Sequence, residues 1–181
     1  MKRNVFLMMA VFGLFLIQSC DEVSDLLDVE ETFEFEEEFV VSGETTTYED
    51  SIVFDLAEAV SLIDEYGDKI KEVIIEEASF MLKDFNGSEE QVLTTGTLEV
   101  SDPDGSGKTE IVSMADYVMH TLVGNPTDLD LQTAGVNKLG DLAANPPHRF
   151  MLHYIAEFNE GPLDFTIVFQ FKAKMVANPL N

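Results

Sequence analysis

The chain has 181 residues, of which 35 are acidic and 10 basic, so its formal net charge is -25 at pH 7. A field of that sign opposes binding to nucleic acid, because neutralising phosphates requires clustered lysine and arginine. The single cysteine cannot form an intramolecular disulfide, and sites in which several thiolates hold a metal are also excluded. We therefore expect no nucleic-acid partner, and we expect a packed core to stabilise the domain.

The N-terminal segment, as far as Cys20, has the pattern of an exported protein. Lys2 and Arg3 precede a largely apolar run from Val5 to Ile17. In a helix with a rise of about 1.5 Å per residue, such a run spans about 20 Å, which is shorter than a hydrocarbon core of about 30 Å. The run therefore predicts a signal peptide and not a permanent transmembrane helix.

The end of the apolar run, Ile17-Gln18-Ser19-Cys20, resembles the lipobox of bacterial lipoproteins in the looser form of Bacteroidota. The usual pattern has Leu, Ala and Gly at the three positions before the cysteine. The resemblance implies cleavage before Cys20, lipidation of that cysteine and a mature protein that begins with it on a membrane surface. An ordinary secretory signal that happens to contain a cysteine is the alternative. The resemblance covers the signal segment alone and assigns the mature domain to no family.

Acidic residues are concentrated beside the predicted anchor. From Asp21 to Asp68 there are 18 Asp or Glu and no Lys or Arg. An anionic membrane repels such a segment over about a Debye length, roughly 8 Å at physiological salt. We divide the chain into a signal peptide (1–19), an acidic tether (20–30) and one domain (31–181). The expected location is the outer membrane or cell surface, with the periplasmic face as the alternative.

Alternation with a period of two predicts strands in the first part of the domain. The first strand has four apolar residues on one side between Phe33 and Val41, and only Glu37 interrupts that row. Glu37 is therefore a candidate for a carboxylate with a raised pKa. A second strand is expected over 48–54. The period then changes to three and four, which predicts a short helix over 56–66 with Asp55 as its N-cap.

The middle of the chain predicts a long strand over 70–85. Its apolar residues fall on odd positions in the first half and on even positions in the second, and a β-bulge between the halves would turn both sets to the same face. The tight-turn pair Asn86-Gly87 leads into a strand over 91–100, so we expect these two strands to form a hairpin. A short strand follows at 109–112. Helical spacing then predicts two helices, over 114–123 and 131–143, although two glycines weaken the second.

The C-terminal part of the chain has the strongest strand pattern. Two alternating segments, 150–158 and 165–175, flank the turn Asn159-Glu160-Gly161-Pro162 and predict a terminal hairpin. About seven strands with two or three short helices predict a mostly-β fold. We expect an antiparallel two-sheet β-sandwich of the immunoglobulin-like kind, because two one-sided apolar sheets bury each other's faces.

Motifs of catalysis are absent from the sequence: there is no Gly-x-Ser-x-Gly elbow, phosphate loop or His-Glu-x-x-His. His148 and His153 are five positions apart, which places them on opposite faces of a strand, and His120 is alone in a predicted helix. We therefore expect neither enzymatic activity nor a cofactor.

The segment from Asp102 to Gly107 resembles the first half of a calcium-binding loop of the EF-hand kind. In that pattern Asp102, Asp104 and Ser106 would supply side-chain oxygens. The twelfth position is Ser113 where the pattern needs a bidentate Glu, and turn chemistry explains the same residues. We expect weak calcium binding or none.

Together these observations predict a membrane-anchored, exported lipoprotein that acts as a non-catalytic binding or interaction module at the cell envelope. Its partners would be the membrane, through the lipid on Cys20, and an exported protein or extracellular component. We expect the contacts at two loops rich in turn residues, 102–107 and 124–130. The alternative is a carrier that holds a hydrophobic small molecule in a cavity between the sheets, lined by the phenylalanines of the mature chain.

Overall fold

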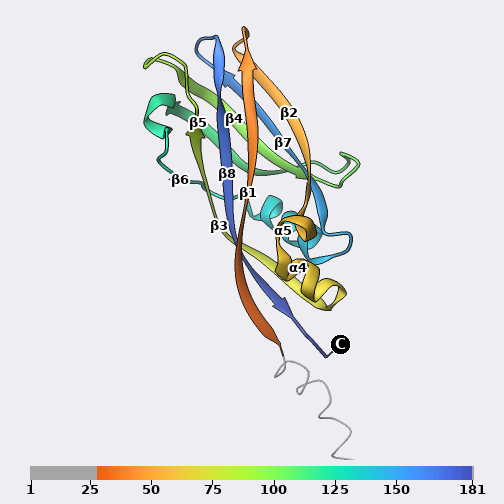
Figure 1. Cartoon of the computed structure of the whole chain (residues 1–181). Coiled ribbons are helices and arrows are strands. Elements are labelled where there is room, and N and C mark those ends of the chain that lie inside the picture. Colours follow the sequence, from red (N-terminus) through yellow and green to blue (C-terminus); the bar gives the residue numbers. More distant parts are fainter. Residues whose placement is uncertain (1–27, 181) are drawn as a thin grey trace, which may run out of the picture.

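Eight β-strands form the framework of the domain in the computed structural model, which describes residues 28–180 (Figure 1). They make two four-stranded antiparallel sheets, so the predicted mostly-β sandwich is confirmed. The predicted signal peptide and Cys20 lie outside the described residues. The strands are β1 (Val29–Gly43), β2 (Thr47–Asp55), β3 (Ile70–Lys83), β4 (Val92–Ser101), β5 (Thr109–Val118), β6 (Thr127–Asp128), β7 (Arg149–Phe158) and β8 (Leu163–Ala177).

The connectivity of the strands is that of a jelly roll. One sheet has the order β1-β8-β3-β6 and the other β2-β7-β4-β5. Within the described chain, β4 and β5 are the only consecutive strands in the same sheet, and every other connection crosses to the opposite sheet. Eight strands ordered in this way form a double-sheet jelly roll, whereas an immunoglobulin constant-type domain has seven strands in sheets of four and three.

Both predicted hairpins are wrong in their pairing, although all four strands exist. β7 and β8 lie in different sheets, and so do β3 and β4. Alternation shows which face of a strand is buried, but it does not identify the neighbouring strand. The turn at 159–162 can extend about 13 Å, which is enough to cross the roughly 10 Å between packed sheets.

The predicted bulge in β3 is confirmed, because its register with β8 shifts between Ile75 and Glu77. This shift turns both apolar halves of the strand inward, with Ile75 and Ala78 buried on either side of it. β1 begins at Val29, so the end of the predicted tether, Val29 and Glu30, belongs to the sheet.

Short helices occupy two of the three predicted helical segments. The first segment is divided into α3 (Leu56–Ala59) and α4 (Ser61–Tyr66), followed by η2 (Gly67–Lys69). Asp55 caps α3 as predicted, since its Oδ1 accepts a hydrogen bond of 3.2 Å from the backbone N–H of Glu58. The third segment is α5 (Thr133–Ala144), which packs against β3 of one sheet and β5 of the other.

The helix predicted over 114–123 is wrong. β5 continues to Val118, and only the single turn η3 (Met119–Leu122) follows. Met114 is opposite Gly96 of β4 and is buried in the core, so strand pairing outweighs the helical spacing of this segment.

Aromatic rings fill the space between the two sheets. Phe35 stacks on Phe171 with ring centroids 4.9 Å apart, and Tyr154 packs edge-on against Phe169 at 5.3 Å. The rings of Phe39 and Tyr154 are fully buried between the two sheets. The phenylalanines that suggested a carrier therefore pack against one another as a core.

Candidate functional site

The loop from Asp102 to Gly107, which resembles half of a calcium-binding loop, connects β4 to β5, and a lysine side chain lies against it. Lys138 of α5 donates a hydrogen bond of 2.9 Å to Asp102 Oδ2 and another of 2.5 Å to the carbonyl oxygen of Gly107. The ammonium group therefore contacts the Asp102 carboxylate that the calcium pattern would use as a ligand.

Turn chemistry accounts for the rest of this loop. The backbone N–H of Ser106 donates to Asp104 Oδ1 at 2.9 Å. Hydrogen bonds from Ser106 lower the pKa of the Asp104 carboxyl, which is fully exposed. Gly105 has a φ of 84°, a conformation that favours glycine. No group of three or more His, Cys, Asp or Glu side chains that could hold a metal ion is found within residues 28–180.

Of the two loops predicted as contact surfaces, 102–107 connects β4 to β5, and 124–130 lies between η3 and α5. The second, 124–130, contains β6, whose Thr127 pairs with Phe80 of β3. The backbone N–H of Leu129 also donates to the carbonyl oxygen of Ala78 at 2.9 Å. This segment is therefore the edge of a sheet, although most of its side chains are exposed.

Glu37 lies in the inward row of β1, between Phe35 and Phe39, and is partly buried. Burial raises the pKa of the Glu37 carboxyl; the charge of Glu38 adds to this, whereas a backbone hydrogen bond at Glu38 opposes it. The prediction of a raised pKa at this position is confirmed.

A more extensive charged surface lies on the outer side of the sheet β1-β8-β3-β6, and we call it the acidic face. Its acidic and basic side chains alternate across the sheet and are joined by several ion pairs. The acidic face consists of Glu30, Glu34, Glu36, Glu38, Glu76, Glu77 and Asp128, together with Lys83, Lys172 and Lys174.

Strand register explains why these residues meet. In one row across the sheet, Lys172 of β8 stands between Glu34 of β1 and Glu77 of β3. In the next row Gln170 of β8 stands between Glu36 and Ser79. The alternation that buries phenylalanine on the inner side of β1 thus places glutamate on its outer side.

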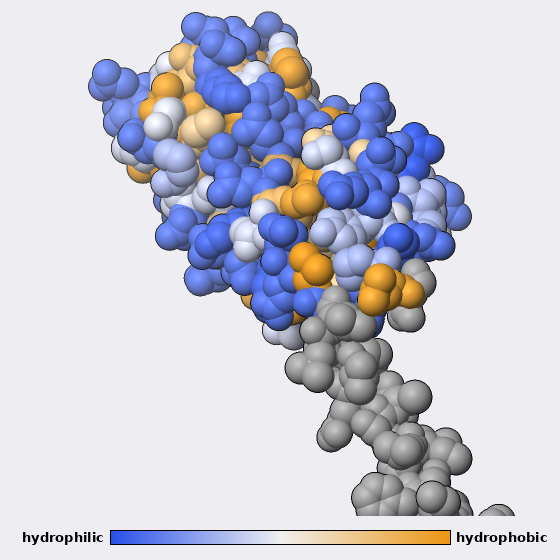
Figure 2. Space-filling model, turned by 60° about the horizontal axis from the view of Figure 1, so that its bottom comes forward, coloured by the Kyte–Doolittle hydropathy of each residue, from blue (hydrophilic) through white to orange (hydrophobic). Residues whose placement is uncertain are grey.

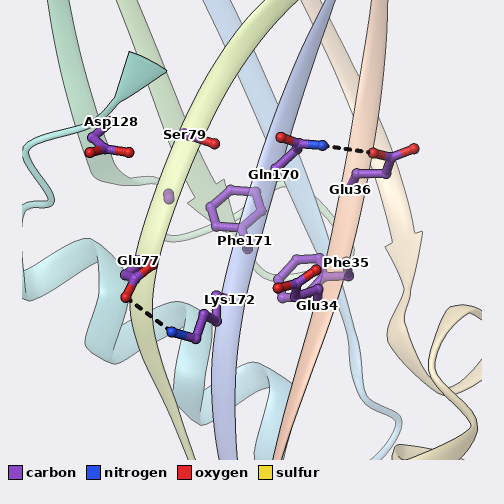
Figure 3. A pocket seen from close by; sticks show the side chains of 10 residues that line it. Glu34, Phe35, Glu36, Glu77, Ser79, Asp128, Gln170, Phe171 and Lys172 are labelled. Atoms are coloured by element: carbon purple, nitrogen blue, oxygen red, sulfur yellow. Dashed lines mark hydrogen bonds and ion pairs between the residues drawn. The ribbon is translucent and has the colours of Figure 1, made fainter. Parts of the chain in front are cut away.

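A shallow hollow of about 340 Å³ lies over these two rows (Figure 3). At one side Lys172 Nζ is 3.0 Å from Glu77 Oε1, and at the other Gln170 Nε2 donates to Glu36 Oε2 at 3.3 Å. Its ionisable side chains are Glu34, Glu36, Glu77, Asp128 and Lys172. Four acids and one base give the hollow a formal charge of -3.

The single lysine does not neutralise this hollow. Lys172 contacts Glu77 at 3.0 Å and Glu76 at 4.0 Å, and its hydrogen bond with Glu77 raises the pKa of its ammonium group. Glu34 is exposed on the other side of the same row. The arrangement favours an added cation and disfavours an anion.

A hydroxyl–imidazole–hydroxyl arrangement lies on the outer side of the other sheet, and motif searching missed it. His153 of β7 has its Nδ1 2.6 Å from Ser51 Oγ of β2 and its Nε2 2.7 Å from Ser101 Oγ of β4. His153 faces outward, but only 3% of it is exposed. The three residues are far apart in sequence, so only strand register could have indicated the group.

No known protein family matches the sequence, and no curated protein matches it. Similar solved structures include turnip yellow mosaic virus, with 10% identity and a TM-score of 0.39 over 86% of this chain and 82% of that chain. Desmodium yellow mottle tymovirus has 9% identity and a TM-score of 0.34 over 82% of each chain. The decameric BFDV capsid protein has 13% identity and a TM-score of 0.36 over 82% of this chain and 97% of that chain. Similarity at this level assigns neither family nor function.

No helix within residues 28–180 is long and apolar enough to cross a membrane.

Proposed function

We propose that this protein is a lipid-anchored, non-catalytic interaction module of the cell envelope, whose acidic face binds a cationic segment of another exported protein or an extracellular component. The observation that supports the proposal is the hollow over Glu34, Glu77 and Lys172, which has a formal charge of -3 and is open to solvent. Its volume of about 340 Å³ lies at the lower end of the range for ligand sites.

The spacing of the acids suits an extended basic segment. Residues on one side of a strand repeat every two positions, at roughly 6.8 Å, and neighbouring strands lie about 4.8 Å apart. Glu34, Glu36 and Glu38 follow one another in this way along β1. A lysine or arginine side chain placed in the hollow would meet carboxylates from β1 and β3 together. Such an association weakens as salt screens the charges.

The proposed anchor fits the position of the acidic face. β1 begins and β8 ends at the same end of the domain, since Val29 is paired with Ala177. Hydrophilic residues cover most of the surface seen from that end, and apolar residues form small separate patches (Figure 2). Lipid on Cys20 would tether this end, and repulsion between acidic residues and anionic lipids would hold the acidic face clear of the bilayer.

The anchor is tested with the full chain expressed in a bacterial host under its own signal. We expect the wild-type protein to incorporate labelled palmitate and to partition into the detergent phase. Cys20→Ala should lose both properties. Identical behaviour of the variant and the wild type would contradict the anchor without affecting the acidic face.

Binding is tested with the detergent-solubilised lipoprotein and a lysine-rich decapeptide as the probe. The triple variant E34Q/E36Q/E77Q removes three charges from the acidic face. The matched control E44Q/E110Q/E157Q removes three charges from exposed positions elsewhere. We expect the first variant to lose at least about tenfold in affinity and the control less than about twofold, with both differences shrinking at high salt. Equal losses would show that only net charge attracts the peptide.

A further inference from the structure

The arrangement of Ser51, His153 and Ser101 has features that a structural histidine does not need. Its three residues stand on adjacent strands in the order β2, β7, β4. Ser101 is fully buried and His153 almost so, whereas Ser51 is exposed on β2, which forms the edge of its sheet. Ser51 is therefore open to solution, whereas the imidazole behind it is covered.

One placement of the protons satisfies all three hydrogen bonds at once. The Ser101 hydroxyl donates to the carbonyl oxygen of Asp102 at 3.0 Å, so its oxygen is left to accept from His153. The Nε2 atom of His153 is then the protonated nitrogen, and Nδ1 presents a lone pair. The Ser51 hydroxyl donates to that lone pair across 2.6 Å.

The surroundings keep this imidazole neutral. Burial lowers the pKa of His153, and the charge of Lys108 lowers it further. Glu99 and Glu49, which also face the ring, act in the opposite direction and are outweighed. A neutral imidazole with one nitrogen oriented by a third group and the other bonded to a serine hydroxyl matches the arrangement that activates serine nucleophiles.

We propose that Ser51 is a nucleophilic hydroxyl that accepts an acyl group from an activated ester, with His153 as its general base. In this step Ser51 Oγ attacks the carbonyl carbon of the ester and His153 Nδ1 takes the hydroxyl proton. The bond from that carbon to the leaving oxygen breaks, and His153 returns the proton to the departing alcohol. The products are a Ser51 ester and one alcohol. Ser101 is a positioning residue, because it contacts only the imidazole.

The test uses the full-length lipoprotein in detergent with p-nitrophenyl acetate as the probe. We expect one equivalent of nitrophenol per chain and an acetyl group on the peptide that contains Ser51. Ser51→Ala should abolish that label, whereas Ser113→Ala, at an exposed serine of β5, should leave it unchanged. His153→Asn should slow labelling by at least about a hundredfold, the lower limit for loss of a general base.

The dependence on pH separates an activated serine from an ordinary one, and it needs only the wild-type protein. With His153 as the base, the labelling rate should reach half of its plateau below about pH 6.5, because the pKa of the imidazole is lowered from its ordinary value. A rate that continues to rise with hydroxide, or labelling of Ser51 no faster than that of Ser113, would overturn the proposal. Nitrophenol release beyond one equivalent would support the nucleophile and contradict the non-catalytic function proposed above.

Discussion

Gly140 of α5 lies directly against the backbone carbonyl oxygen of Val73 on β3. A Cβ atom added at Gly140 would approach that oxygen more closely than non-bonded atoms can. Gly135, earlier in the same helix, stands in the same relation to the carbonyl of Glu110 on β5. The two glycines therefore let α5 lie on the backbones of both sheets and hold them together at one end of the sandwich.

Gly140→Ala should destabilise the domain, in spite of the higher helix propensity of alanine. Propensity alone predicts a gain of about 1 kcal/mol, whereas overpacking against a backbone that cannot move aside typically costs about 1–3 kcal/mol. We expect the free energy of unfolding in urea to fall. Asn137→Ala, at an exposed position of α5, changes helix propensity without affecting the contact between Gly140 and Val73. It should be neutral or slightly stabilising. A more stable Gly140→Ala variant would show that α5 can move away from β3.

Glu37→Gln should stabilise the protein at pH 7, by about 1 kcal/mol at most for a partly screened charge. Burial raises the pKa of Glu37, so its protonated form is favoured in the folded state, and the cost of ionisation appears as pH rises through the raised pKa. The gain from Glu37→Gln should therefore vanish below the ordinary pKa of about 4.3.

The control for this prediction is Glu44→Gln, which removes the same charge from an exposed turn. Glu44→Gln measures how much stability the protein gains when its net charge of -25 is reduced by one. That gain is subtracted from the stability gained by Glu37→Gln. Chemical denaturation of the three proteins at pH 4 and pH 7 provides the comparison. Equal stabilities of the Glu37 and Glu44 variants at pH 7 would contradict a penalty specific to Glu37.

Stability should fall as the solution becomes acidic, in part because of His153. Its pKa is lowered in the folded protein, so the unfolded chain binds the proton first. The stabilising contribution is complete above the unfolded pKa of about 6.5, and it is lost as pH falls from there through the folded pKa. Over that interval the slope for one proton is about 1.4 kcal/mol per pH unit.

Urea denaturation between pH 5 and pH 7.5 measures this slope. His153→Asn should reduce the pH dependence of the unfolding free energy by the contribution of one proton. His120→Gln, at an exposed histidine, changes the same residue type elsewhere. If His153→Asn and the wild type lost stability in parallel over this range, the buried imidazole would not be responsible.

Lys138→Met should strengthen calcium binding at the loop between β4 and β5. The substitution removes the ammonium group that contacts Asp102 Oδ2 and the carbonyl of Gly107, while keeping the apolar stem. In calorimetry the wild type should bind calcium no more tightly than the weakest natural sites, about 10⁻³ M, and the variant at least about tenfold better. Adding Asp102→Ala should cancel the gain. Submicromolar affinity of the wild type would contradict this account.

The buried faces of the strands could be predicted from sequence alone. The row from Phe33 to Val41, the bulge between Ile75 and Ala78 and the alternation over 165–175 all appear in the structure as predicted. Burial by a sheet acts on every second residue of one strand, so the pattern is local and is visible in the sequence. The partly buried Glu37 could be identified for the same reason.

Strand partners and the glycine contacts of α5 could not be predicted in this way. A turn such as 159–162 can join neighbours in one sheet or cross between two sheets, and the alternation on either side is the same. Gly135 and Gly140 reduced the helical propensity of their segment, yet the packing of α5 on two sheets requires them. Both the strand partners and the glycine contacts depend on a strand that is remote in sequence, so a local sequence pattern cannot predict them.

Composition and local pattern by themselves determined the acidic charge, the mostly-β class and the inward or outward direction of most strand residues, because each of these is a property of neighbouring positions in the chain. Only the tertiary structure decided which outward residues meet. It placed Glu34 and Glu77 on either side of Lys172, and it brought His153 between two serines that are 102 and 52 positions away along the chain. These side-chain contacts depend on the order and register of the strands, and that order and register arise from the packing of the whole core.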